Sequence, residues 1–147
     1  QQYSAGKARS RSSSPKFVLW NDALTSAVGV ERYEQARSDP TRWGRLVENA
    51  VGAHLLNHLA GLPGEVTYWR DGNREVDYVV ETGGALFGLE VKSGRPARTA
   101  GLEAFRARHR RARALVIGAG GMPLEEFFRS DPRRLLSGAD LRDHSPR

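Results

Sequence analysis

Asp77, Glu90 and Lys92 fall within two neighbouring stretches that are predicted to be strands, REVDYVVE and ALFGLEVK. Gly83-Gly84 separates the stretches, and two adjacent glycines are typical of a two-residue hairpin loop. Such a loop fixes the register and places Asp77 directly opposite Glu90. Because side chains alternate along a strand, Lys92 is expected on the same face as Glu90. The hairpin is therefore predicted to gather two acids and an amine on one face and apolar side chains on the other.

Two carboxylates brought this close repel each other unless one holds a proton or a cation lies between them. A divalent ion meets this need, and because the chain has no cysteine its oxygen ligands suit Mg²⁺ or Mn²⁺. The ammonium of Lys92 is expected to orient a metal-bound water or help to deprotonate it. This set is suited to phosphodiester hydrolysis. The alternative is a solvated sheet face that carries a cross-strand salt bridge.

The elements that must position these residues can be read from the hydrophobic pattern. A helix is predicted over about 40–60, with Ser38-Asp39 as capping residues and Glu48 beside its buried stripe. Three strands follow as an antiparallel meander over 65–70, 74–81 and 85–92. A crossover helix at about 99–111 leads to an apolar strand at 114–117, and a short helix at 123–128 follows. The order predicts an α/β domain in which helices flank the sheet.

The composition along the chain suggests one domain between two polar ends. Residues 1–16 are rich in Ser, Gly and Lys/Arg and are expected to form a flexible basic arm or linker. The domain is expected to span residues 17–130, and its first part, through Gly29, is expected to dock onto the main body. Residues 131–147 are expected to be a weakly ordered basic tail. The chain starts at Gln1 and its single methionine is Met122, so we expect it to be a piece of a longer polypeptide.

The charge balance favours anionic partners. The chain has 23 Lys+Arg against 17 Asp+Glu, a net charge of +6, which biases it towards polyanions such as nucleic acid. Seven of the arginines fall between positions 95 and 113, and a solvated helix face is favoured over a nucleic-acid patch for this cluster: Arg95, Arg98, Arg106, Arg108, Arg110, Arg111 and Arg113. The sequence has neither a signal-peptide pattern nor an apolar run long enough to cross a bilayer, so we expect a cytoplasmic protein without a membrane partner.

The acids and the order of elements resemble the PD-(D/E)xK nuclease superfamily. Its first acid matches Asp77, its Glu-x-Lys matches Glu90-Val91-Lys92, and its frequent helical acid matches Glu48 in GRLVENAVGAHLL. Val76 stands where many members have proline. The resemblance implies a restriction-endonuclease-like core, with Glu48, Asp77 and Glu90 as Mg²⁺ ligands and Lys92 as the water-positioning base or electrostatic partner.

A narrower resemblance runs from about Ser13 to Phe128. The stretches SSPKFVLWNDAL, WGRLVENAVGAHLL, YWRDGNREVDYVV, LFGLEVKSG and GLEAF resemble the C-terminal domain of a widespread group of prokaryotic AAA-type ATPases of largely unknown function. This implies an upstream ATPase domain in the same parent polypeptide. It also implies descent from nucleases, with or without retained cleavage.

Five further residues are expected to contact DNA, although each alone is more often an ordinary surface residue: Arg70, Arg74, Ser93, Arg95 and Arg98. The first functional hypothesis is a metal-dependent nuclease acting on DNA. The second is a non-catalytic DNA-binding or regulatory module that couples the upstream ATPase to its partner. The sequence indicates neither the oligomeric state nor the form of nucleic acid.

Two other motifs are better explained by structure than by ligand binding. His54 and His58 are one helical turn apart, but the sequence suggests no third zinc ligand, so a structural role is favoured. The GAGG stretch at 118–121 does not have the spacing of a dinucleotide-binding fingerprint, and a tight turn is the better interpretation.

Overall fold

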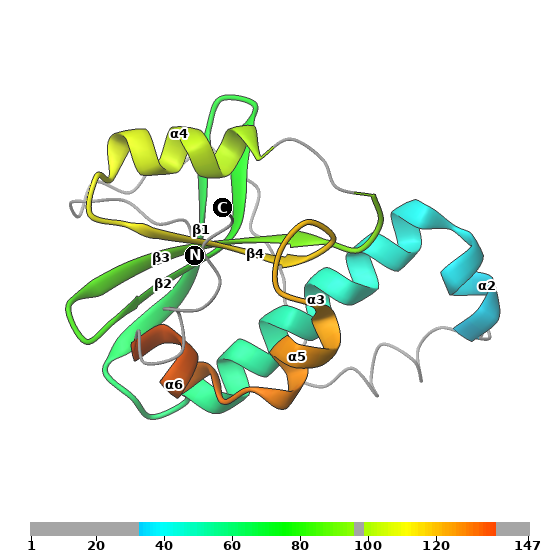
Figure 1. Cartoon of the computed structure of the whole chain (residues 1–147), viewed down its shortest axis with the longest axis horizontal. Coiled ribbons are helices and arrows are strands. Elements are labelled where there is room, and N and C mark those ends of the chain that lie inside the picture. The colour runs from blue at the N-terminus through cyan, green and yellow to red at the C-terminus, as the bar shows by residue number, and fades with distance from the viewer. Residues whose placement is uncertain (1–32, 96–98, 138–147) are drawn as a thin grey trace.

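A four-stranded mixed sheet with helices on both faces forms the centre of the molecule (Figure 1). The structure is a computed structural model that describes residues 33–95 and 99–137. Its elements follow one another as α2 (Tyr33–Ser38), α3 (Pro40–Leu59), β1 (Gly64–Asp71), β2 (Arg74–Thr82), β3 (Ala85–Lys92), α4 (Ala100–Arg108), β4 (Arg113–Gly118), α5 (Leu124–Arg129) and α6 (Pro132–Ser137). The expected basic arm, the expected docking segment and Arg98 lie outside the described residues.

The strand order in the sheet is β1-β2-β3-β4. The first three strands form an antiparallel meander, and β4 pairs with β3 in parallel after the crossover through α4. Gly83 and Gly84 form the predicted two-residue loop, with φ of 56° and 75°. These positive values are strained for residues with a side chain, so the two glycines fix the hairpin and its register. The predicted meander and crossover are confirmed.

Helix α3 begins where the sequence indicates. The side chain of Asp39 caps it by accepting hydrogen bonds from the backbone N–H groups of Thr41 at 2.9 Å and Arg42 at 3.2 Å. Pro40 occupies the first helical position, where its missing N–H has no cost. The buried face of the helix consists of Val47, Val51, Gly52, Ala53 and Leu55. This stripe holds α3 against the sheet and so fixes where Glu48 lies.

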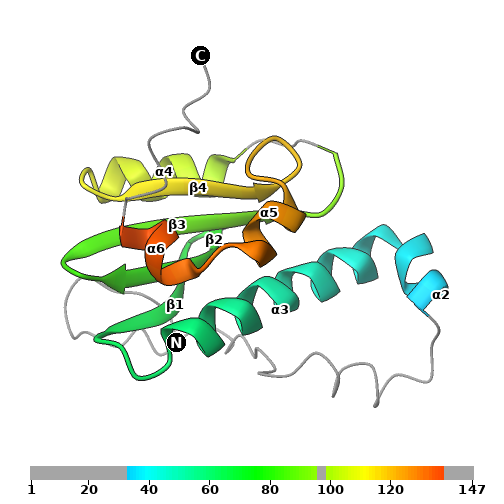
Figure 2. The same ribbon diagram turned by 60° about the horizontal axis from the view of Figure 1, so that its bottom comes forward.

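Two hydrophobic cores sandwich the sheet. The larger one lies on the face covered by α3, α5 and α6 and includes Val51, Leu55, Tyr78, Val80, Phe87, Leu89, Leu115, Ile117, Phe127, Leu135 and Leu136. The smaller one lies beneath α4 and consists of Trp69, Val76, Val79, Leu102, Phe105 and Ala112. Figure 2 shows α4 on one side of the sheet and α3, α5 and α6 on the opposite side. The apolar face predicted for the hairpin is thus the α3 face.

Two segments differ from the sequence-based expectations, at residues 132–137 and at the end of α4. Residues 132–137, assigned above to a weakly ordered tail, form α6 and bury Leu135 and Leu136, so the folded part extends beyond residue 130. Helix α4 ends at Arg108 rather than near residue 111, because Ala112 N–H donates to the carbonyl of His109 in a turn at 2.8 Å.

Within the described ranges, none of the helices has the length and apolar character needed to cross a lipid bilayer.

Candidate functional site

The candidate site lies where β2 and β3 separate. The ladder keeps the predicted register from the hairpin loop to the pair of Tyr78 and Leu89, and the backbone pairing stops there. In a continued ladder Asp77 would face Glu90, as the sequence suggests. Instead, Asp77 Oδ2 accepts a hydrogen bond at 2.8 Å from the backbone N–H of Val91. The carboxylate of Asp77 therefore bridges the two strands at the point where they part.

A bulge in β2 is the reason for this separation. Between two regular pairs of the β1–β2 ladder, β1 has the single residue Tyr68, whereas β2 has both Asp77 and Tyr78. A bulge of this kind bends the strand and re-aims its side chains. Tyr78 packs into the α3-side core, and its hydroxyl donates to the backbone carbonyl of Glu48 at 2.8 Å.

Glu90 and Lys92 form a partly buried ion pair near the end of β3. Lys92 Nζ lies 2.7 Å from Glu90 Oε1, and their side chains are only 20% and 11% exposed, respectively. The other carboxylate oxygen, Oε2, is buried as well. Alternation along β3 places both residues on the face of Gly88, where a Cβ atom would press against Phe105 of α4. The amine and the acid predicted to share a face therefore do so.

Glu48 approaches from the opposite face of the sheet. Gly44 and Glu48 are four residues apart and lie on the same side of α3. A Cβ atom at Gly44 would lie 3.4 Å from Ser93 Oγ, so this side of the helix faces the end of β3. Tyr78 fixes the same turn of α3 through its bond to the Glu48 carbonyl. Glu48 therefore lies near the end of β3 that carries Lys92, but on the face of the sheet opposite to Glu90 and Lys92.

The arrangement does not contain a ready three-carboxylate metal centre. Across residues 33–95 and 99–137, no three side chains among the acids and histidines are grouped so that they could hold a metal ion. The structure brings Asp77, Glu90 and Lys92 to one stretch of two strands, and it leaves Glu48 in the layer behind them. The full ligand set of Glu48, Asp77 and Glu90 stays a prediction.

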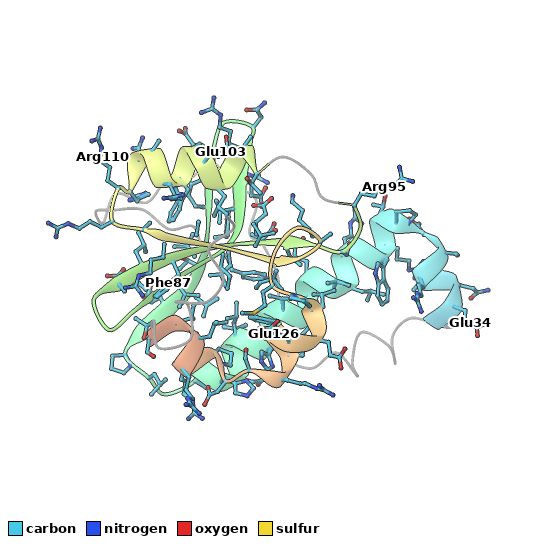
Figure 3. The ribbon with its side chains drawn as sticks, in the orientation of Figure 1. Glu34, Phe87, Arg95, Glu103, Arg110 and Glu126 are labelled. Carbon is cyan, nitrogen blue, oxygen red and sulfur yellow. The ribbon has the colours of Figure 1, made fainter. Side chains whose placement is uncertain are left out.

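The flanking basic residues lie at the same end of the sheet. Arg70 is hydrogen-bonded to Glu75, and this bond raises the pKa of the guanidinium. Arg74 starts β2 and is exposed, as is Arg95, and Ser93 is half-buried against α3. Figure 3 shows Arg95 at the end of the molecule that carries α2.

The glycine-rich stretch at 118–121 supports the same region, a contact that sequence reasoning missed. Ala119 N–H donates to the carbonyl of Lys92 at 2.9 Å. Gly118 has φ of 96°, and any Cβ atom there would overlap the same Lys92 carbonyl. The bond from Gly121 N–H to the Gly118 carbonyl, at 3.0 Å, agrees with the predicted tight turn. Glycines after a buried strand were the available signal, but only the fold shows that they pack on β3.

His54 connects α3 to the link between α5 and α6, and His58 bonds back to the backbone of α3. His58 Nδ1 lies 2.9 Å from the His54 carbonyl, and His54 Nε2 lies 3.2 Å from the Ser130 carbonyl. Burial lowers the pKa of His54, and its ring lies 5.2 Å from that of Phe127. Each histidine thus has a backbone partner within the fold, which agrees with the structural role favoured from the sequence.

Comparison with known proteins places the chain in a family. The profile described as a domain of unknown function, DUF4143, matches residues 43–128, which is more than half of the chain. This stretch runs from the first turns of α3 to α5 and contains the whole sheet. Searches of curated proteins and of solved structures gave no match. The chain belongs to the DUF4143 family, which is typically associated with the C-terminal regions of AAA-type ATPases.

Proposed function

We propose that this domain carries out metal-dependent phosphodiester hydrolysis on DNA, in the manner of PD-(D/E)xK nucleases, as part of a larger AAA-type ATPase. One observation carries the proposal: Asp77 bonds to β3 between Glu90 and Lys92, so two acids and an amine meet where the strands part. The family's association with AAA-type ATPases supports the larger context.

The donor chemistry of this corner fits Mg²⁺ or Mn²⁺. Magnesium is commonly held by one or two carboxylates, with water and substrate phosphates completing its octahedron. Asp77 and Glu90 would hold the ion, and Glu48 would join them from α3. When bound, the ion supplies Lewis-acid polarisation of the phosphate and a more acidic water.

The residues of the chain have separate tasks in this proposal. Asp77 joins β2 to β3 through its bond to Val91, which holds its carboxylate at the point where the backbone pairing stops. The Lys92 ammonium, now paired with Glu90, would turn to the scissile phosphate and offset the charge that develops in the transition state. Arg70, Arg74, Ser93 and Arg95, together with Arg98, would hold the phosphates on either side.

A second function is favoured by a different observation. The described acids are not grouped for metal binding, and Lys92 closes an ion pair with Glu90. Both features are expected of a nuclease site that has lost its activity. The domain would then be a non-catalytic DNA-binding or regulatory module coupled to the upstream ATPase.

The decisive experiment measures both cleavage and metal binding. The chain is incubated with supercoiled, linear and single-stranded DNA in Mg²⁺, Mn²⁺ or EDTA, and Mn²⁺ binding is followed separately by electron paramagnetic resonance. Asp77→Asn retains a side-chain oxygen that can accept from Val91 N–H but removes the charge. It is expected to reduce cleavage by roughly 100-fold or more and to weaken Mn²⁺ binding, while the far-UV circular dichroism is unchanged.

Glu125→Gln on α5 is the matched control, because it also removes one carboxylate charge, at a position where that side chain is 76% exposed. It is expected to leave cleavage and Mn²⁺ binding as they are. If the unaltered chain cuts none of the three DNA forms with either metal, the hydrolytic function is wrong. The regulatory function then predicts DNA affinity that falls with salt and does not change in Asp77→Asn.

A further inference from the structure

The end of the sheet farthest from Lys92 carries a dense group of arginines. Five exposed arginines fall within eight residues at the end of α4, in the following turn and at the start of β4, and we call them the arginine patch: Arg106, Arg108, Arg110, Arg111 and Arg113. No acidic residue lies between Glu103 and Glu125 in the sequence. The patch is therefore a local concentration of positive charge.

The patch arginines are not engaged by acids of the fold. Within residues 33–95 and 99–137, none of the five forms an ion pair, whereas Arg70, Arg129 and Arg133 each have an acidic partner. Glu103 lies in the first turn of the same helix, and Glu81 lies on β2, where it pairs with Leu86 of β3. Since like charges repel, keeping five unpaired guanidinium groups together carries an electrostatic cost that an anionic partner would relieve.

The five arginines lie on both sides of the sheet near β4. In the sheet formed by the described residues β4 is the last strand, and Arg113 at its start lies over the Phe87 ring on the α3 side, 5.6 Å from the ring centre to the guanidinium carbon. Arg106 and Arg108 belong to α4 on the other side. Figure 3 shows Arg110 pointing away from the body at the end of α4, far from Arg95.

A hollow lies within the patch. Its volume is about 280 Å³, and the β2–β3 loop and the α4–β4 turn line it through Gly84, Ala85, Leu86, His109, Arg110 and Arg111. His109 packs against Phe105 with ring centres 4.7 Å apart and ring planes tilted by 43°, and its carbonyl accepts from Ala112 N–H. Two guanidinium groups at a concave surface are suited to bidentate contacts with phosphate oxygens.

We infer that the arginine patch binds the phosphate backbone of DNA as an interface separate from the corner formed by Asp77, Glu90 and Lys92. The inference rests on the proposed function only in its choice of DNA as the polyanion. Strand β3 spans five residue steps from Phe87, the partner of Arg113, to Lys92, or about 17 Å. A duplex that lies along the sheet would cover this distance in about five base pairs.

The composition of the patch argues against a lipid surface. Stable binding to a bilayer interface usually combines basic residues with exposed apolar side chains that insert into it. The large apolar side chains that are exposed in the described residues are Leu62 and Phe128, and neither belongs to the patch. A backbone of regularly spaced phosphates needs no such insertion.

The test measures the affinity of the full chain for a fluorescent duplex of about 20 base pairs across a salt series, without divalent ions. The variant Arg110→Ala/Arg111→Ala is expected to bind roughly 10- to 100-fold more weakly at low salt and to have a salt slope smaller by about two. Arg129→Ala/Arg134→Ala, on α5 and α6, is the matched control with the same charge change, and it is expected to keep the wild-type affinity and slope.

Four outcomes would overturn the inference. The first is an unchanged slope in the Arg110/Arg111 variant while the wild type binds, which leaves the proposed function intact. The second is equal loss in the control variant, which would show that only total charge matters. The third is loss of binding to phosphatidylserine vesicles but not to DNA. If the wild type binds no duplex even at low salt, both this inference and a duplex substrate for the proposed function are wrong.

Discussion

The partly buried ion pair of Lys92 and Glu90 makes a sharp prediction about stability. Replacing Lys92 with alanine leaves the Glu90 carboxylate, whose side chain is 11% exposed, without its cation at 2.7 Å. Breaking a fully buried pair in this way costs about 3–5 kcal/mol. Because the Lys92 side chain retains 20% exposure, we expect a loss of about 2–4 kcal/mol in the free energy of unfolding.

Urea denaturation in EDTA, followed by the fluorescence of the buried Trp69, measures this loss directly. For a chain of this size each kcal/mol lowers the midpoint temperature of unfolding by about 3–4 °C, so Lys92→Ala should lower it by roughly 6–16 °C. The control is Arg129→Ala, which breaks the exposed pair with Glu125 and should cost no more than about 0.5 kcal/mol.

A double variant separates the lost pair from the lost lysine side chain. In Glu90→Gln/Lys92→Met neither a buried charge nor its partner remains, so the double variant should lose less stability than the two single variants together, with a coupling of about 1–3 kcal/mol. The reasoning is refuted if Lys92→Ala costs no more than Arg129→Ala, or if the single costs simply add in the double variant.

Two further predictions concern packing and pH. A Cβ atom at Gly101 would overlap the backbone carbonyl of Glu75, so Gly101→Ala should lower the free energy of unfolding by roughly 2–4 kcal/mol. The loss should be larger than for Gly88→Ala, because the neighbours of Gly88 are side chains that can move. Equal losses for the two variants in urea denaturation would contradict this. Hydrogen bonds from Arg133 lower the pKa of Asp131 from 3.8 to about 2, so the contribution of this carboxylate is complete above about pH 4 and lost as pH falls towards 2. Between pH 7 and pH 2.5 the midpoint temperature of unfolding should therefore fall less for Asp131→Asn than for the wild type. If the two midpoint temperatures fall in parallel, Asp131 is not the source of this pH dependence.

Short-range sequence patterns predict much of the local structure. The cap at Asp39 and the three- and four-residue spacing of apolar residues predict α3 within one residue of its observed end. Gly83-Gly84 predicts both the hairpin and its register, and alternation then predicts which side chains of β2 and β3 face α3. The face predicted to be polar is wrong in part, because Val76 and Val79 are buried there in the core beneath α4. These features depend on contacts between residues close together in the chain, so the sequence alone determines them.

The details of the candidate site depend on long-range packing. The bulge at Asp77 arises from pairing with β1. Because of it, Asp77 does not face Glu90 as expected, and its carboxylate accepts a hydrogen bond from the backbone N–H of Val91. Glu48 is on the predicted helix, but the layer in which that helix packs decides which face of the sheet it serves.

Helix α6 and the glycine turn at 118–121 show the same division. Short segments with few apolar residues give almost no periodic signal, yet Leu135 and Leu136 fill a gap in the core, and Ala119 bonds to the backbone of Lys92. The sequence by itself determined which residues can do chemistry and which strands carry them. The tertiary structure alone decided their distances, because hydrogen bonds and packing between distant segments set where the regular ladder stops.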